Sequence, residues 1–137
     1  MSLDPLILRS SFDLVIGRRP DLTVRFYEIL FERHPELAPM FRRDRAAQSR
    51  MLAEAIAAVL DHLEDAPWLQ STLATLGARH QGYGVTAAMY DQVGGALLAT
   101  LAEVAAEAWT PAVADQWTLA YGAIAGMMQA GTVSAAA

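Results

Sequence analysis

Apolar side chains recur every three or four residues through almost the whole chain, which is the spacing of one face of an α-helix. No alternating apolar and polar run bounded by hairpin turns interrupts this pattern. Prolines divide it into segments, because proline is accepted in the first turn of a helix and disrupts the interior. We predict long helices over residues 4–17, 20–35, 45–64 and 67–82, then from 86 to at least 104 and from 110 to at least 128, with a short helical turn over 36–41. The chain is therefore predicted to be all-α.

The size and charge of the chain narrow the possible functions. Its 137 residues suffice for one domain with a buried core and are too few for two. The formal net charge is -5, and there is no Lys/Arg-rich run with interleaved aromatic residues, so nucleic acid is not an expected partner. The absence of cysteine excludes disulfides and thiolate metal sites and is compatible with the cytoplasm. We expect one cytoplasmic domain over residues 1–137, whose last few residues form a frayed tail.

Two segments bear on a membrane location. Asp4 and Arg9 interrupt the first twelve residues, so this segment does not match a secretory signal peptide. Residues 116–137 carry no charge, which leaves a membrane span as one interpretation. Glutamine, threonine, serine and glycine make this stretch only weakly apolar, and no Lys or Arg flanks it. We therefore favour a buried amphipathic helix that ends in the Ala-rich tail, and expect no membrane partner.

A histidine lies at the end of one predicted apolar stripe. His80 follows Leu69, Leu73 and Leu76 at helical spacing and comes just before the break at Gly82. Neutral imidazole is a good ligand for heme iron when it projects from an apolar face. A lone histidine is more often a core residue with hydrogen-bonded ring nitrogens, so both interpretations stay open on this evidence.

Two further polar residues lie among apolar neighbours. Tyr27 lies inside an aromatic helix, where it is either a core residue or a buried donor that faces a ligand. Gln48 is the only amide on the stripe that continues through Leu52, Ile56 and Val59, and it is either a residue at the helix margin or a donor. Neither residue alone indicates a function.

Their joint pattern is more specific. The pieces that matter are Phe26-Tyr27-Glu28-Ile29-Leu30-Phe31; His34-Pro35-Glu36-Leu37 and Phe41; Gln48 and Leu52; Leu76-Gly77-Ala78-Arg79-His80; Tyr83-Gly84-Val85; Tyr90; Val93-Gly94; Leu97-Leu98; and Trp117 with Ala120-Tyr121-Gly122. From about residue 6 to residue 130 the chain resembles the globin domain of flavohemoglobins and the related single-domain bacterial hemoglobins. The resemblance implies a globin fold, a helical sandwich around one heme b (protoporphyrin IX iron).

The resemblance also implies roles for individual residues. His80 would be the proximal ligand of the heme iron, and Tyr90 would hydrogen-bond close to it. The remaining implied heme contacts are Phe41 stacked on the porphyrin, Val85 at the heme edge, and Tyr27, Gln48 and Leu52 in the distal pocket. From the chemistry of the side chains, we expect an apolar wall of Leu52, Ile56, Leu73 and Leu76 to exclude water. Heme propionates would meet basic residues at the cleft mouth, for which the candidates are Arg79, Arg45 and Arg50.

One position departs from the family pattern. Flavohemoglobins place a glutamate on the last helix near the proximal histidine and tyrosine, and in this register the matching residue is Thr132. A carboxylate there would make the histidine more basic, so its absence predicts a weaker electron push to the iron. Gln129, one turn earlier, could partly substitute. The weaker push favours reversible ligand binding over activation chemistry.

Several functions remain open on the sequence. The first is a globin that reversibly binds O2, with NO and CO as further ligands, for storage, delivery or buffering. The alternative is nitric oxide dioxygenase activity with electrons from an external reductase, because no sequence remains here for a reductase module. A heme-based gas sensor is a lesser alternative, and a heme-free structural globin a further one. The chain is expected to be a monomer or a homodimer.

Overall fold

The computed structural model describes residues 3–41 and 44–131, without the side chain of Arg45. Within these ranges every regular element is helical. The elements are α1 (Pro5–Arg18), α2 (Leu22–Arg33), the 3-10 helix η1 (Pro35–Met40), α3 (Arg45–Asp61), α4 (Ala66–Gly82), α5 (Ala87–Ala105), the 3-10 helix η2 (Ala106–Ala108) and α6 (Pro111–Ala130). The all-α prediction is therefore confirmed, and the six long helices lie where the proline and apolar pattern placed them.

Side-chain caps explain several helix starts. A carboxylate oxygen of Asp4 accepts the backbone N–H of Leu6 at 3.0 Å, and one of Asp65 accepts that of Trp68 at 3.1 Å. The Thr110 hydroxyl accepts the N–H of Val113 at 3.3 Å. Each cap satisfies a backbone donor that the first turn of a helix leaves without a partner, and a proline follows each cap within two residues.

Helix α3 is shorter than predicted, because it ends at Asp61 rather than near residue 64. His62 closes the helix: its Nδ1 donates to the carbonyl of Ala58 at 2.7 Å. The His62 ring also stacks on Trp68, with ring centroids 3.7 Å apart. The backbone then turns, since the Asp65 N–H donates to the His62 carbonyl. Apolar periodicity could not reveal this stop, because it depends on a contact with the next helix.

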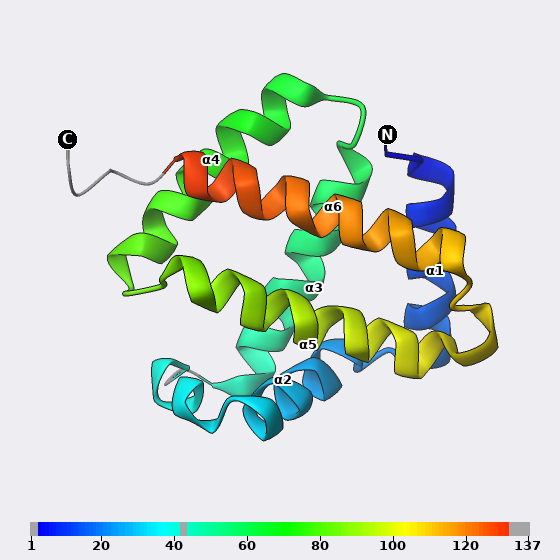
Figure 1. The fold of residues 1–137 in the computed structure, drawn as a ribbon, viewed down its shortest axis with the longest axis horizontal. Helices are drawn as coiled ribbons and strands as arrows, with labels where there is room; N and C mark the ends of the chain where they lie inside the picture. The colour runs from blue at the N-terminus through cyan, green and yellow to red at the C-terminus, as the bar shows by residue number, and fades with distance from the viewer. Residues whose placement is uncertain (1–2, 42–43, 132–137) are drawn as a thin grey trace.

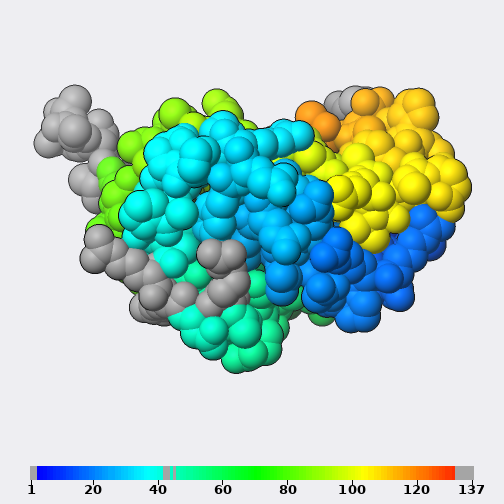
Figure 2. All heavy atoms as spheres, turned by 90° about the horizontal axis from the view of Figure 1, so that it is seen from below, coloured from blue at the N-terminus to red at the C-terminus, as the bar shows by residue number. Residues whose placement is uncertain are grey.

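The closest helix pairs are α4 with α6 and α2 with α5 (Figure 1). Helix α2 also lies against α3, and α1 contacts both α5 and α6. One buried cluster is centred on α1, α2 and α5 and includes Leu30, Leu101 and Trp117. A second, smaller cluster joins α4, α5 and α6 through Leu73, Tyr90 and Met128. Seen from below in Figure 2, α2 and η1 cover the middle of the molecule, with α1 and the end of α5 at one side.

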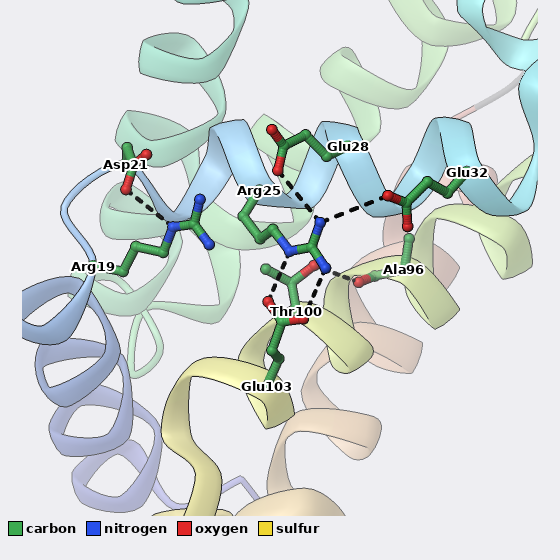
Figure 3. A network of polar contacts seen from close by, with 8 residues as sticks. All are labelled: Arg19, Asp21, Arg25, Glu28, Glu32, Ala96, Thr100 and Glu103. Atoms are coloured by element: carbon green, nitrogen blue, oxygen red, sulfur yellow. Dashed lines mark hydrogen bonds and ion pairs between the residues drawn. The ribbon is translucent and has the colours of Figure 1, made fainter.

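An ion pair between Arg25 and Glu103 connects α2 to α5 at the surface (Figure 3). Arg25 donates from Nε and Nη2 to the two carboxylate oxygens of Glu103, each at 2.8 Å, and also lies near Glu28 and Glu32. The guanidinium lowers the pKa of Glu103 below its ordinary value. Partly exposed pairs of this kind contribute at most about 1 kcal/mol each. The network therefore orients two helices more than it stabilises the fold.

The described part of α6 does not form a membrane span. Across residues 3–41 and 44–131, no helix combines the length and the apolar character needed to cross a bilayer. The uncharged stretch from residue 116 instead buries Trp117, Ala120, Ala125 and Met128 within the protein. Residues 132–137, which the expected tail and Thr132 occupy, lie outside the described residues.

Candidate functional site

The candidate ligand His80 lies near the end of α4 and is partly buried. Its Nδ1 lies 2.8 Å from the backbone carbonyl oxygen of Leu76, one turn earlier. A carbonyl only accepts, so Nδ1 carries the proton in the neutral ring and the lone pair resides on Nε2. The ring is thus held in one tautomer with its outer nitrogen available to a metal.

The turn after α4 fixes the backbone at the same residue. The carbonyl of His80 accepts the N–H groups of both Tyr83 and Val85, each at 3.0 Å. Gly84 makes this turn possible, because its φ of +92° lies in a region that side chains rarely adopt. The ring of Tyr83, largely exposed, lies edge-on to the His80 ring at a centroid distance of 6.5 Å. His80 is therefore restrained through both its ring and its main chain.

Tyr90 forms the centre of the cluster beside α4. It is buried, and Leu76 and Val85 pack against the same cluster. Within the described part of the chain its hydroxyl is buried without a hydrogen-bond partner. Burial raises the pKa of the Tyr90 hydroxyl, so the group stays protonated near neutral pH. A buried donor without a partner among the described residues is unusual.

Tyr121 holds Tyr90 from α6. Its hydroxyl donates to the backbone carbonyl of Tyr90 at 2.6 Å. Its ring fills the space beside Gly94, where an added Cβ would lie only 2.5 Å from a ring carbon. Burial raises the pKa of Tyr121 well above its ordinary value, which keeps the donated proton in place.

The predicted distal residues gather on α2, α3 and the segment between them. Tyr27 is buried, and its ring lies 5.3 Å from that of Phe41 and 5.9 Å from that of Phe31, measured between centroids. Phe31 and Phe41 contact each other edge-on at 5.4 Å. Leu52 packs against the same large cluster. The structure therefore brings Tyr27, Phe41 and Leu52 to one side of the molecule.

Gln48 and its neighbour Ser49 carry buried oxygens without partners. The side-chain Oε1 of Gln48 and the hydroxyl of Ser49 accept or donate no hydrogen bond among the described residues. Thr23 donates to the backbone carbonyl of Ser49 at 2.9 Å, which ties α2 to α3 one turn before Tyr27. The sequence pattern gave no sign of either residue, because Thr23 lies on another helix and Ser49 lies beside the apolar stripe of Gln48.

The helix of Gln48 and Leu52 does not pack closely on the helix of His80, although α2 and α5, which carry Tyr27 and Tyr90, lie directly against each other. Helices α3 and α4 are not among the closely packed pairs of the described elements, whereas each packs closely on another partner. Leu73, expected in the apolar wall, is buried in the second cluster with Tyr90, Ala125 and Met128, and Leu76 packs against the same cluster. Arg79 and Arg50 are exposed.

Other candidate sites are weaker. In the part of the chain that the structure describes, no three His, Asp or Glu side chains are grouped for a metal ion. Two surface hollows, of about 610 Å³ and 150 Å³, flank Arg9 between α1 and the end of α3. Neither is lined by a predicted site residue, so neither belongs to the site at His80.

Known proteins with similar sequences and folds establish the family. The Globin family model matches residues 24–128. The flavohemoprotein of Vibrio cholerae is 35% identical over 118 residues, and that of Bacillus thuringiensis 33% over 122 residues. These matches cover 84% and 87% of this chain but only 30% of each flavohemoprotein, so the chain spans less than a third of their length.

The solved structures agree. A bacterial globin from Campylobacter jejuni superposes with a TM-score of 0.78 at 27% identity, covering 93% of this chain and 92% of its own. An engineered carbene transferase from Rhodothermus marinus superposes with a TM-score of 0.81, covering 94% and 92%; at 23% identity it supports the fold alone. The chain belongs to the globin family, and this membership implies heme as its cofactor.

Proposed function

We propose that this chain holds one heme b through His80 and reversibly binds O2, and also NO and CO, for oxygen storage, delivery or buffering. The observation that carries the proposal is the 2.8 Å contact between His80 Nδ1 and the Leu76 carbonyl. It leaves Nε2 free. In metal sites, a hydrogen bond from the other ring nitrogen to a carbonyl is the usual way in which a histidine ligand is oriented toward the metal. Heme, when bound, supplies an iron atom that takes up diatomic gases.

One buried polar atom fits such a group. The Tyr90 hydroxyl on α5 is a donor that is buried without a partner in the described chain. Leaving a donor in this state costs about 1–3 kcal/mol, which an acceptor on a cofactor can offset. We assign Leu76, Val85 and Phe41 to apolar contact with the porphyrin and Arg79 to its propionates.

The distal residues suit an uncharged ligand that acquires negative charge. Tyr27 supplies a hydroxyl and Gln48 an amide, which donate hydrogen bonds without introducing a charge of their own. Leu52 completes the pocket as an apolar wall that excludes water. One such donor contributes about 1–3 kcal/mol, which is enough to slow ligand release about tenfold or more.

The proximal residues favour reversible binding over nitric oxide dioxygenase activity. The partner of His80 is a neutral backbone carbonyl, and Tyr90 stays protonated. Among the residues with a described position, no carboxylate forms a hydrogen bond with either side chain. A neutral partner leaves imidazole less basic than a carboxylate would, so the electron push toward iron stays modest.

The test is to mix the oxygenated protein rapidly with NO, with and without an external flavin reductase and its reductant. We expect one equivalent of NO to be consumed and no sustained turnover. The same mixture with the reductase and free hemin serves as the control. Sustained nitrate production above that control would refute the storage proposal and establish the dioxygenase alternative.

A further inference from the structure

The helix that carries His80 packs most closely on a single neighbour. Among the closely packed pairs of described elements, α4 occurs only with α6, which crosses it in Figure 1. Its other contacts are made by side chains, chiefly with Tyr90 of α5 and between Trp68 and His62. The place of the α4 backbone is therefore set mainly by its contact with α6.

That contact brings backbone against backbone. A Cβ added at Gly77 would lie 1.8 Å from the carbonyl oxygen of Met128 and 2.4 Å from its carbonyl carbon. One turn away, a Cβ at Gly131 would lie 2.1 Å from the carbonyl oxygen of Ala74. All these atoms belong to helix main chains, so no side-chain rotation can make room. The two glycines allow an approach that any other residue would prevent.

We propose that Gly77 is a positioning residue for His80: its missing side chain lets α4 lie directly on the α6 backbone and so places the histidine ring relative to the heme site. This inference rests on the proposed heme-binding role of His80. Gly77 follows Leu76, the acceptor of the His80 ring, and precedes His80 by three residues, less than one turn. Any displacement at Gly77 is thus passed directly to both residues.

The size of the displacement follows from the geometry. Real Cβ atoms essentially never lie closer than 3.0 Å to such an atom, so Gly77→Ala must widen the gap by at least about 1.2 Å. Since the other contacts of α4 are made by side chains, which can adjust, the helix can move outward as a body and remain helical. A misplacement of about 1 Å in a functional site changes its properties by up to about a hundredfold.

The test compares Gly77→Ala with Gly122→Ala, an alanine substitution on α6 that meets nothing within 4 Å. In the ferrous, ligand-free protein, resonance Raman spectroscopy reports the iron–histidine stretching band, and transfer to excess apomyoglobin reports heme loss. For Gly77→Ala we expect a shifted band and heme loss faster by about tenfold or more. Gly122→Ala should match the wild type in both. A wild-type band and heme-loss rate in Gly77→Ala would overturn the inference.

Two further measurements keep the inference testable. If Gly77→Ala does not fold by far-ultraviolet circular dichroism, Gly131→Ala must show the same band shift to a smaller degree, and an unshifted band would refute the inference. If the wild type holds no heme, the proposed function fails by itself. Amide hydrogen exchange of the heme-free proteins then decides: α4 must exchange faster in Gly77→Ala than in Gly122→Ala, and equal rates would refute the contact's role.

Discussion

Gln48 carries a buried atom that lowers the stability of the fold and a side chain with a proposed role in ligand binding. Replacing it with leucine should therefore stabilise the heme-free protein and weaken its hold on oxygen once heme is bound. The Oε1 of Gln48 is buried without a partner in the described chain. An unpaired buried acceptor costs about 1–3 kcal/mol, whereas an apolar group of the same shape costs nothing of this kind. Because the rest of the Gln48 side chain is only partly buried, we take the low end. Gln48→Leu should raise the free energy of unfolding of the heme-free protein by about 1 kcal/mol.

The same substitution removes a distal donor, so oxygen dissociation should accelerate about tenfold, which corresponds to about 1.4 kcal/mol. Urea unfolding followed by circular dichroism measures the first effect, and stopped-flow displacement of oxygen by CO measures the second. Ser49→Ala is the matched control, since it deletes the neighbouring unpaired hydroxyl. It should stabilise the protein and leave oxygen dissociation unchanged. A Gln48→Leu protein that is less stable and releases oxygen at the wild-type rate would refute the reasoning.

Three further predictions concern other parts of the molecule. Tyr27→Phe should speed oxygen dissociation about tenfold by flash photolysis or stopped flow if its hydroxyl donates to the ligand; a wild-type rate would leave Gln48 alone in that role. Ala106 has a φ of +49°, a strained value for a residue with a side chain, so Ala106→Gly should raise the unfolding free energy by about 1 kcal/mol, and a loss would contradict the strain. Because Arg25 lowers the pKa of Glu103, their pair stabilises the fold above the ordinary glutamate pKa and loses that contribution as pH falls through the lowered value. Glu103→Gln should therefore cost less than about 1 kcal/mol at neutral pH and nothing in strong acid, measured by urea unfolding at several pH values; an equal cost at every pH would argue against the ion pair.

The helices could be predicted from the sequence because their signals are local. Asp4 and Thr110 each come directly before the proline of the helix that they cap, and Asp65 comes two residues before Pro67. The end of α3 could not be predicted in this way. It depends on the stacking of His62 on Trp68, which no periodicity encodes.

The contacts of the candidate site also include some that are local in the chain and some that depend on helix packing. The His80 ring bonds to a carbonyl four residues earlier, a contact that helical geometry alone makes available. The hydrogen bonds from Thr23 to Ser49 and from Tyr121 to Tyr90 span 26 and 31 residues, and helix packing alone determines them. The approach of Gly77 to Met128 is equally non-local, so a glycine in a helical pattern gave no sign of it.

The predicted apolar wall also depends on how the helices pack, which the sequence pattern does not show. Leu73 shares a stripe with Leu69 and Leu76, and a helical stripe does not say which neighbour each of its members will face. In the folded chain Leu73 is buried in the cluster that includes Tyr90, Ala125 and Met128, and Leu76 is partly buried against it, so the expected wall stays a prediction. The individual roles assigned to Tyr27, Gln48, Leu52, Phe41 and Val85 stay predictions.

The central claim is that His80 holds the heme, and the most direct measurement is the visible absorption spectrum of heme-reconstituted wild type beside His80→Ala and His62→Ala. His62 is the matched control, since its Nδ1 makes the same bond to a carbonyl four residues earlier. We predict a Soret band that shifts on reduction and again with CO in the wild type and in His62→Ala. In His80→Ala the heme should be lost on gel filtration. A His80→Ala protein that retains its heme with the wild-type spectrum would contradict the account.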